Sequence, residues 1–175
     1  SGSPFLGFNI PQKKNVLIIQ AELNFYAIKG RVQKMILNKM MGGAHRNLTI
    51  TDCLSEHVDN DEQYAKLKSM ILREKAEVVI IDPLVFFHGS SENSNDEMGN
   101  VMSRFRSLVV ETGISLILVH HDGKSFDLKG GDSSRGASSI FGAVDTDISI
   151  GTATKGKTHP IHQWLNFSMR HSRTP

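Results

Sequence analysis

The chain has 175 residues, of which 39% are hydrophobic and 22% charged, an ordinary globular balance and a suitable length for one domain over residues 1–175. Lys and Arg number 20 against 18 Asp and Glu, and the resulting net charge of +2 is too small to indicate nucleic-acid binding by itself. The single cysteine, Cys53, excludes an internal disulfide and fits a reducing cytoplasm, and we find neither a membrane-spanning apolar run nor a signal peptide.

Continuous apolar runs at residues 16–19, 78–81 and 116–119 predict three strands that are covered on both faces, as in a parallel sheet. A further short strand is expected at residues 48–50. The run at residues 147–150 alternates between polar and apolar side chains, which is typical of an edge strand or a half-exposed strand.

Three segments between these runs have the apolar spacing of helices. The first, residues 24–41, is followed by two glycines, and the second covers residues 61–75. The third begins with Ser94 and Glu97 at the spacing of a capping box and ends at Gly113. Alternating strands and helices predict an α/β fold with a mostly parallel, twisted sheet and right-handed crossovers. The three apolar faces comprise Ile28, Val32, Met35, Ile36 and Met40; Tyr64, Leu67 and Ile71; and Met98, Val101, Met102, Phe105, Leu108 and Val109.

Acidic or imidazole side chains follow three of the predicted strands. Glu22 follows the first run, Asp82 follows residues 78–81, and His120 and His121 follow the last of the three. Ligands of such sheets bind beyond the carboxyl ends of the strands, and unpaired charges gathered there would cost free energy without a ligand. Each residue also has an ordinary alternative: a helix N-terminal acid, a turn residue before proline, or a hydrogen-bonded core histidine.

The chemistry that these residues suggest is phosphoryl transfer. Asp82, directly after a hydrophobic strand, can hold Mg²⁺ through water. Glu22 can orient and deprotonate the attacking water. His120 or His121 can sense the terminal phosphate, and the sequence does not decide between the two histidines.

Two polar loops follow these residues, at residues 86–95 and 122–134. We expect Lys124, Lys129 and Arg135 to meet the phosphates of DNA. The alternative is that these three cations are ordinary solvated loop charges.

Several segments resemble RecA-like ATPases. They are Glu22 after a strand, the VIIDPL segment around Asp82, LVHHDGK at residues 118–124, and the stretch from SRGASS to GAVD at residues 134–145. The likeness is closest to plasmid and phage replicative helicases of the RepA kind, is more distant to DnaB, and covers nearly the whole chain.

The resemblance implies a RecA-like sheet with a C-terminal antiparallel hairpin, in an enzyme that hydrolyses ATP with Mg²⁺ to act on single-stranded DNA in replication or recombination. It implies that Glu22 is the catalytic glutamate, Asp82 the Walker B aspartate, and His120 or His121 the sensor. Arg170 corresponds to an arginine finger that reaches a neighbour's nucleotide in a homo-oligomeric, usually hexameric, ring. The two polar loops correspond to those that line the central DNA channel.

In that family, a phosphate-binding loop precedes the part that corresponds to the start of this chain. We therefore expect the chain to be truncated at its N-terminus and not to hydrolyse ATP efficiently by itself. Residues 151–158, GTATKGKT, match the phosphate-loop pattern to the letter. Because the following residues alternate as a strand does, and residues 155–157 suit a turn, we predict a hairpin there; a helix over residues 158–171 would reverse that choice.

Two other functions stay open. A metal-dependent hydrolase would use Asp82, His88, His120, His121 and Asp122 to hold Zn²⁺ or Mn²⁺, although adjacent histidines at a strand end point to opposite faces. A non-catalytic oligomerisation or DNA-binding module would bind DNA in a salt-sensitive manner, with no response to nucleotide.

Overall fold

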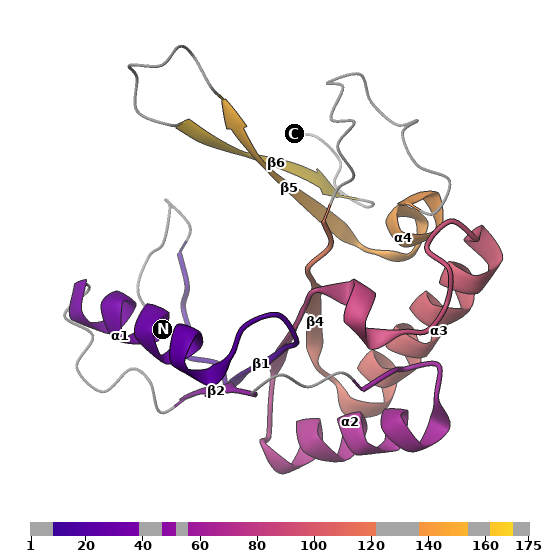
Figure 1. Ribbon diagram of the computed structural model, residues 1–175, viewed down its shortest axis with the longest axis horizontal. Helices are drawn as coiled ribbons and strands as arrows, with labels where there is room; N and C mark the ends of the chain where they lie inside the picture. Colours follow the sequence, from indigo (N-terminus) through magenta and orange to yellow (C-terminus); the bar gives the residue numbers. More distant parts are fainter. Residues whose placement is uncertain (1–8, 39–46, 52–55, 122–136, 154–161, 170–175) are drawn as a thin grey trace.

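The computed structural model describes residues 9–38, 47–51, 56–121, 137–153 and 162–169. Strands and helices alternate along most of this length, as predicted (Figure 1). The elements are β1 Val16–Gln20, α1 Phe25–Asn38, β2 Leu48–Ile50, α2 Asp61–Arg73, β3 Val78–Asp82, the 3₁₀ helix η2 Leu84–Phe87, α3 Asn95–Thr112, β4 Ser115–Leu118, α4 Ala137–Ala143, β5 Thr146–Ala153 and β6 His162–Met169.

Four strands form one parallel sheet in the order β2-β1-β3-β4. Residue Val16 of β1 lies beside Val78 of β3, and Gln20, the last residue of β1, lies beside Asp82, the last residue of β3. Ile81 of β3 in turn lies beside Leu118 of β4. The structure therefore confirms the predicted α/β fold of the RecA-like form, with a parallel sheet whose strands end together at one edge.

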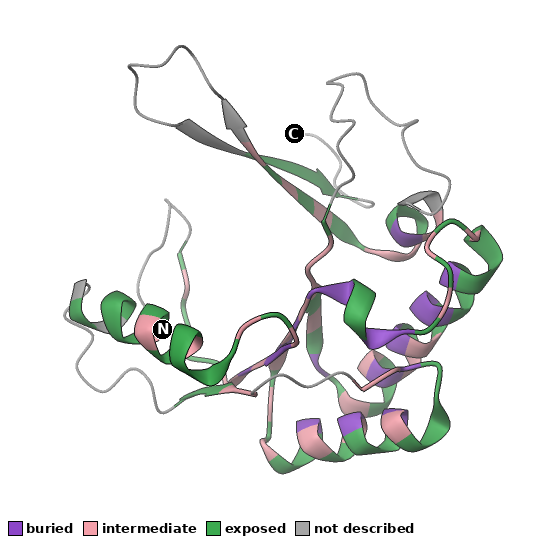
Figure 2. Ribbon diagram, viewed as in Figure 1, coloured by how far each residue is buried: buried purple, intermediate pink, exposed green. Residues whose placement is uncertain are grey.

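The hydrophobic core lies on one face of this sheet. Leu17 and Ile19 of β1 and Val79 and Ile81 of β3 are fully buried there. Helices α2 and α3 cover them with the apolar faces that the sequence predicts, and Figure 2 shows the buried positions where these helices and the sheet meet. The buried helix residues are Tyr64, Leu67, Ile71, Met98, Val101, Met102, Phe105 and Leu108.

Helix α3 has the predicted ends, with one difference at its start. Ser94 Oγ accepts a hydrogen bond from the Glu97 N–H at 3.3 Å, which is half of a capping box. The Glu97 carboxylate does not return to Ser94; it accepts from the Ser91 N–H at 2.7 Å. At the other end, Gly113 has a φ of 71°, a left-handed conformation that favours glycine, and its N–H donates to the Val109 carbonyl at 2.8 Å.

The prediction that the strands are covered on both faces is wrong for β4, on the face opposite the core. Ile117, in the middle of β4, is 48% exposed. Right-handed crossovers from β2 to β3 and from β3 to β4 place α2 and α3 on the same face, and only α1 is left for the other. Helix α1 lies apart from α2 and α3 in Figure 1, and its Tyr26, Met35 and Leu37 are largely exposed.

Strands β5 and β6 form a separate antiparallel pair, which confirms the predicted hairpin over the phosphate-loop reading. The residues after the loop-like motif are in β6, not in a helix; residues 154–161, which include the predicted turn, lie outside the described residues. Ile148 pairs with Phe167 and Ile150 with Leu165, so all four side chains share one face. All four are more than 40% exposed, which agrees with a half-exposed strand.

Among the helices of the described residues, we find none with the length and apolar character that crossing a lipid bilayer requires.

Two leucines of α2 offer a matched test of where the core lies. Leu67 is fully buried and Leu72 is 54% exposed. We expect Leu67→Ala to lower the free energy of unfolding by about 2–5 kcal/mol, because it leaves a cavity between α2 and the sheet. Leu72→Ala, which removes the same atoms from the surface, should change it by less than about 1 kcal/mol. Urea denaturation measures both; equal losses would contradict the packing described here.

Candidate functional site

The segments that leave β1, β3 and β4 are held side by side by hydrogen bonds beyond the strands. The Ala21 N–H donates to the Asp82 carbonyl at 3.0 Å, which joins the exits of β1 and β3. The Val119 N–H donates to the Ile81 carbonyl at 2.9 Å, and the Leu84 N–H donates to the Val119 carbonyl at 2.7 Å. These bonds define one continuous edge, which we call the exit edge, formed by residues 20–23, 82–84 and 119–121.

The turn after β1 is shaped by a buried amide that the sequence analysis did not single out. Gln20 is only 4% exposed. Its Oε1 accepts from the Leu23 N–H at 2.7 Å, and its Nε2 donates to the Leu23 carbonyl at 2.7 Å and to the Thr51 carbonyl at 3.3 Å. The side chain thus closes a three-residue turn that carries Glu22 at the exit edge. In the sequence, Gln20 is only a polar residue at the end of an apolar run, which does not indicate this role.

Glu22 and His121 meet across this edge. The Glu22 Oε1 atom lies 3.4 Å from the His121 Nε2 atom, and the two side chains are 45% and 65% exposed. A pair with this exposure adds little to stability. Its relevance is positional, because it brings two of the predicted site residues within reach of the same ligand.

Asp82 ends β3 beside Gln20 and is half-buried. Its carbonyl is bonded to the turn that carries Glu22. Of the residues predicted from strand ends, Glu22, Asp82, His120 and His121 therefore all lie along the exit edge.

The two adjacent histidines face different carboxylates, as expected for neighbours at the end of a strand. His121 faces Glu22, whereas His120 Nδ1 lies 3.9 Å from Glu92 Oε1. The same Glu92 oxygen lies 3.8 Å from Nε2 of His88, whose side chain is 1% exposed. The sequence analysis missed Glu92, since a single acid in a Ser- and Asn-rich loop carries no periodic or motif signal.

Several predicted residues lie outside the described residues. They are the proposed DNA contacts Lys124, Lys129 and Arg135, the proposed arginine finger Arg170, and the alternative metal ligand Asp122.

Within the part of the chain that the structure describes, no group of three or more His, Cys, Asp or Glu side chains is arranged to hold a metal ion. The alternative of a metal-dependent hydrolase with His88, His120 and His121 as ligands therefore gains no support from the described residues. The separate directions of His120 and His121 give the physical reason, because the two imidazoles do not converge.

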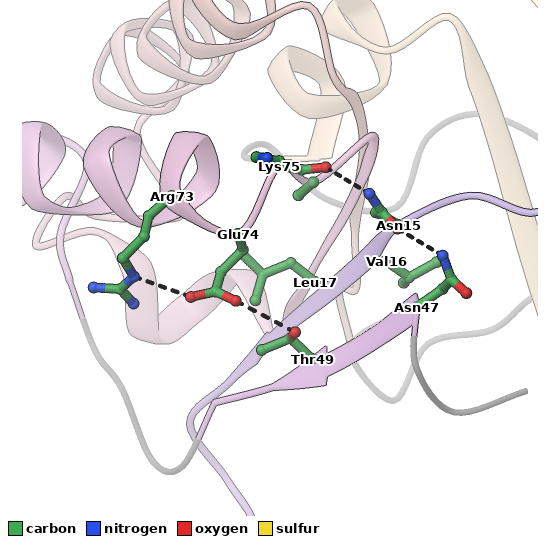
Figure 3. A pocket seen from close by; sticks show the side chains of 9 residues that line it. Asn15, Val16, Leu17, Asn47, Thr49, Arg73, Glu74 and Lys75 are labelled. Carbon is green, nitrogen blue, oxygen red and sulfur yellow. Dashed lines mark hydrogen bonds and ion pairs between the residues drawn. The ribbon is translucent and has the colours of Figure 1, made fainter. Parts of the chain in front are cut away.

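A polar cavity of about 270 Å³ lies at the opposite edge of the sheet, where β1 and β2 begin (Figure 3). Its polar side chains bond to one another: Asn47 Nδ2 donates to Asn15 Oδ1 at 2.7 Å, and Arg73 Nε donates to Glu74 Oε1 at 3.0 Å. The Asn15 amide also donates to the Lys75 carbonyl at 3.2 Å. These contacts hold the amino ends of the strands to the end of α2, and the residues with candidate chemistry lie at the other edge.

The fold defines a protein of the α/β class with a RecA-like parallel sheet. A family described as an AAA domain matches residues 1–127, and the chain belongs to this family of P-loop ATPases. A search of curated proteins gave no match.

Gln20 provides a test of how the exit edge is built. We expect Gln20→Met, which keeps the length of the side chain but removes its hydrogen bonds, to lower the free energy of unfolding by about 1–3 kcal/mol. The half-buried Leu23 and Thr51 carbonyls lose a donor in this variant. Gln33→Met on the exposed side of α1 is the matched control and should stay within about 0.5 kcal/mol of the wild type. If the two variants unfold alike in urea, Gln20 does not organise the turn.

Proposed function

We propose that this chain is part of a Mg²⁺-dependent ATPase that acts on single-stranded DNA in replication or recombination, as a helicase core within a homo-oligomeric ring. The observation that carries the proposal is the meeting of Glu22 and His121 at 3.4 Å on the exit edge, next to the end of β3 at Asp82. Membership of an ATPase family supports the nucleotide part of the proposal, and the resemblance to replicative helicases supports the DNA part.

Glu22 is proposed as the general base. Its carboxylate is partly exposed, so it can reach a water molecule on the open side of the edge, and the Gln20 turn fixes its backbone. His121, close to Glu22 and more exposed, is well placed to contact the terminal phosphate. The geometry thus favours His121 over His120 as the residue nearest the nucleotide.

Asp82 fits the role of a Mg²⁺ ligand through water. Carboxylate oxygens are the ligands that Mg²⁺ prefers, and Asp82 ends a strand beside the turn that carries a second carboxylate, Glu22. When bound, the ion would neutralise charge on the phosphates. The contribution of the protein is to hold the two carboxylates at one edge.

The DNA contacts are proposed from charge and from exposed aromatic surface. Lys124, Lys129 and Arg135 supply cations for phosphates. Phe86, in η2 directly after Asp82, is 42% exposed and offers a ring on which a base can stack. Arg170 is proposed to reach the nucleotide of a neighbouring subunit.

The test is hydrolysis of Mg-ATP by the full protein that the gene encodes. Glu22→Gln should lower the rate about 10²–10⁴-fold without abolishing nucleotide binding, because it removes the base and keeps the shape. Glu77→Gln is the control, because Glu77 lies at the opposite edge of the sheet. There a hydrogen bond from Lys14 and, to a smaller extent, one from the Asn15 N–H lower the pKa of the Glu77 carboxyl group. A Glu22→Gln protein that hydrolyses ATP at the wild-type rate would exclude the proposed base.

The same assay separates the ATPase from its proposed DNA substrate. Single-stranded DNA should raise the rate of hydrolysis, and the stimulation should fall as salt rises. If single-stranded DNA does not change the rate of hydrolysis at low salt, the ATPase part of the proposal stands and the helicase part is excluded.

A further inference from the structure

Three ionisable side chains from two separate segments meet at one oxygen atom. His88 and Glu92 belong to the segment between η2 and α3, and His120 follows β4. Glu92 Oε1 lies 3.8 Å from His88 Nε2 and 3.9 Å from His120 Nδ1. Both the Glu92 oxygen and the His88 nitrogen are buried, and neither has a hydrogen-bond partner among the described residues. Buried polar atoms without a hydrogen-bond partner are rare in folded proteins, and each one calls for an explanation.

The first step concerns where the proton of His88 lies. Its Nδ1 is 3.1 Å from the carbonyl oxygen of Ser90, which can only accept a hydrogen bond. Nδ1 therefore carries a hydrogen. In a neutral ring, Nε2 is then an acceptor, and the atom that it faces, Glu92 Oε1, is also an acceptor when the carboxyl group is ionised.

Two acceptors that face each other in a buried place repel one another and remain unsatisfied. At 3.8 Å the two atoms are also too far apart for a direct hydrogen bond, so both stay without a partner. His120 Nδ1 approaches the same oxygen from the end of β4, at 3.9 Å. The Glu92 oxygen is thus the common neighbour of both imidazole rings.

The position of Glu92 is imposed by the anchoring of its segment. The Gly89 N–H donates to Asp59 Oδ2 at 2.8 Å, and the Ser90 hydroxyl donates to the same oxygen at 3.2 Å. On the other side, the Ser91 N–H donates to Glu97 Oε2 at 2.7 Å. The backbone just before Glu92 is therefore held both by Asp59, which precedes α2, and by Glu97 of α3. In this position the Glu92 carboxylate is directed at the two histidines.

We propose that Glu92 is a positioning residue: it holds His88 and His120 on one carboxylate oxygen, and so ties the end of β4 to the segment that follows β3. The two adjacent histidines then have separate tasks, with His121 beside Glu22 and His120 linked to the Phe86-to-Asn95 loop. This rests on the proposed function, since His120 matters for catalysis only if the exit edge handles a nucleotide.

The experiment follows the imidazole nitrogens of the 175-residue chain by NMR, without nucleotide. Glu92→Gln keeps the shape of the side chain, removes its charge and offers an N–H₂ donor to Nε2 of His88. We expect the ring signals of His88 and His120 to shift by more than their line widths, while those of His121 stay. Glu22→Gln is the matched control and should shift only His121. If either the His88 or the His120 ring is unmoved in Glu92→Gln, the shared contact does not exist.

A second variant keeps the test valid if Glu92→Gln proves unstable. His88→Asn retains a donor for the Ser90 carbonyl and removes Nε2. The proposal predicts that the His120 signals shift in this variant, through the common carboxylate, and unchanged His120 signals would overturn it.

A separate arm distinguishes this proposal from the proposed function. Mg-ADP added to the full protein that the gene encodes should shift His121. If Mg-ADP shifts no histidine while Glu92→Gln still moves both rings, nucleotide handling at the edge fails and the positioning by Glu92 stands.

Discussion

The parallel register of β1, β3 and β4 is the constraint on which the rest of this structure depends. Because parallel strands end at a common edge, the residues after three distant runs of sequence become neighbours through the backbone pairing alone, without requiring contacts between their side chains. The hydrogen bonds from Ala21 to Asp82 and from Val119 to Ile81 continue this register for one step beyond the strands. The gathering of Glu22, Asp82 and His121 at one edge is therefore a consequence of backbone geometry, which the buried face under α2 and α3 stabilises.

Sequence patterns predicted this part well because the relevant signals are local. Leu67 of α2 and Phe105 of α3 follow helical spacing, and the acids and histidines directly follow apolar runs. Gln20 and Glu92 could not be predicted in the same way, because their roles come from groups distant in sequence: the Thr51 carbonyl for Gln20, and His120 for Glu92. The exposed face at Ile117 was missed because a continuous apolar run does not tell which connections lie on which side.

The two edges of the sheet differ in how their polar groups are used. At the amino ends, Asn15 is bonded to Asn47 and to the Lys75 carbonyl, and Glu74 is bonded to Arg73, so these groups hold elements together (Figure 3). At the exit edge, Glu22 and His121 are partly exposed, and His120 is turned toward the buried Oε1 atom of Glu92. This contrast is the physical basis for proposing ligand binding at the exit edge and a structural role for the polar groups at the amino ends of the strands.

Mapping the metal site of the nucleotide complex tests the central claim most directly. In the full protein with ADP, Fe²⁺ in place of Mg²⁺ cuts the backbone next to the bound ion when ascorbate and peroxide are added. The account predicts cuts within residues 20–23, 82–84 and 119–121, and none of them without nucleotide. Cuts at residues 47–49 and 73–76, beside the cavity at the other edge, would contradict it.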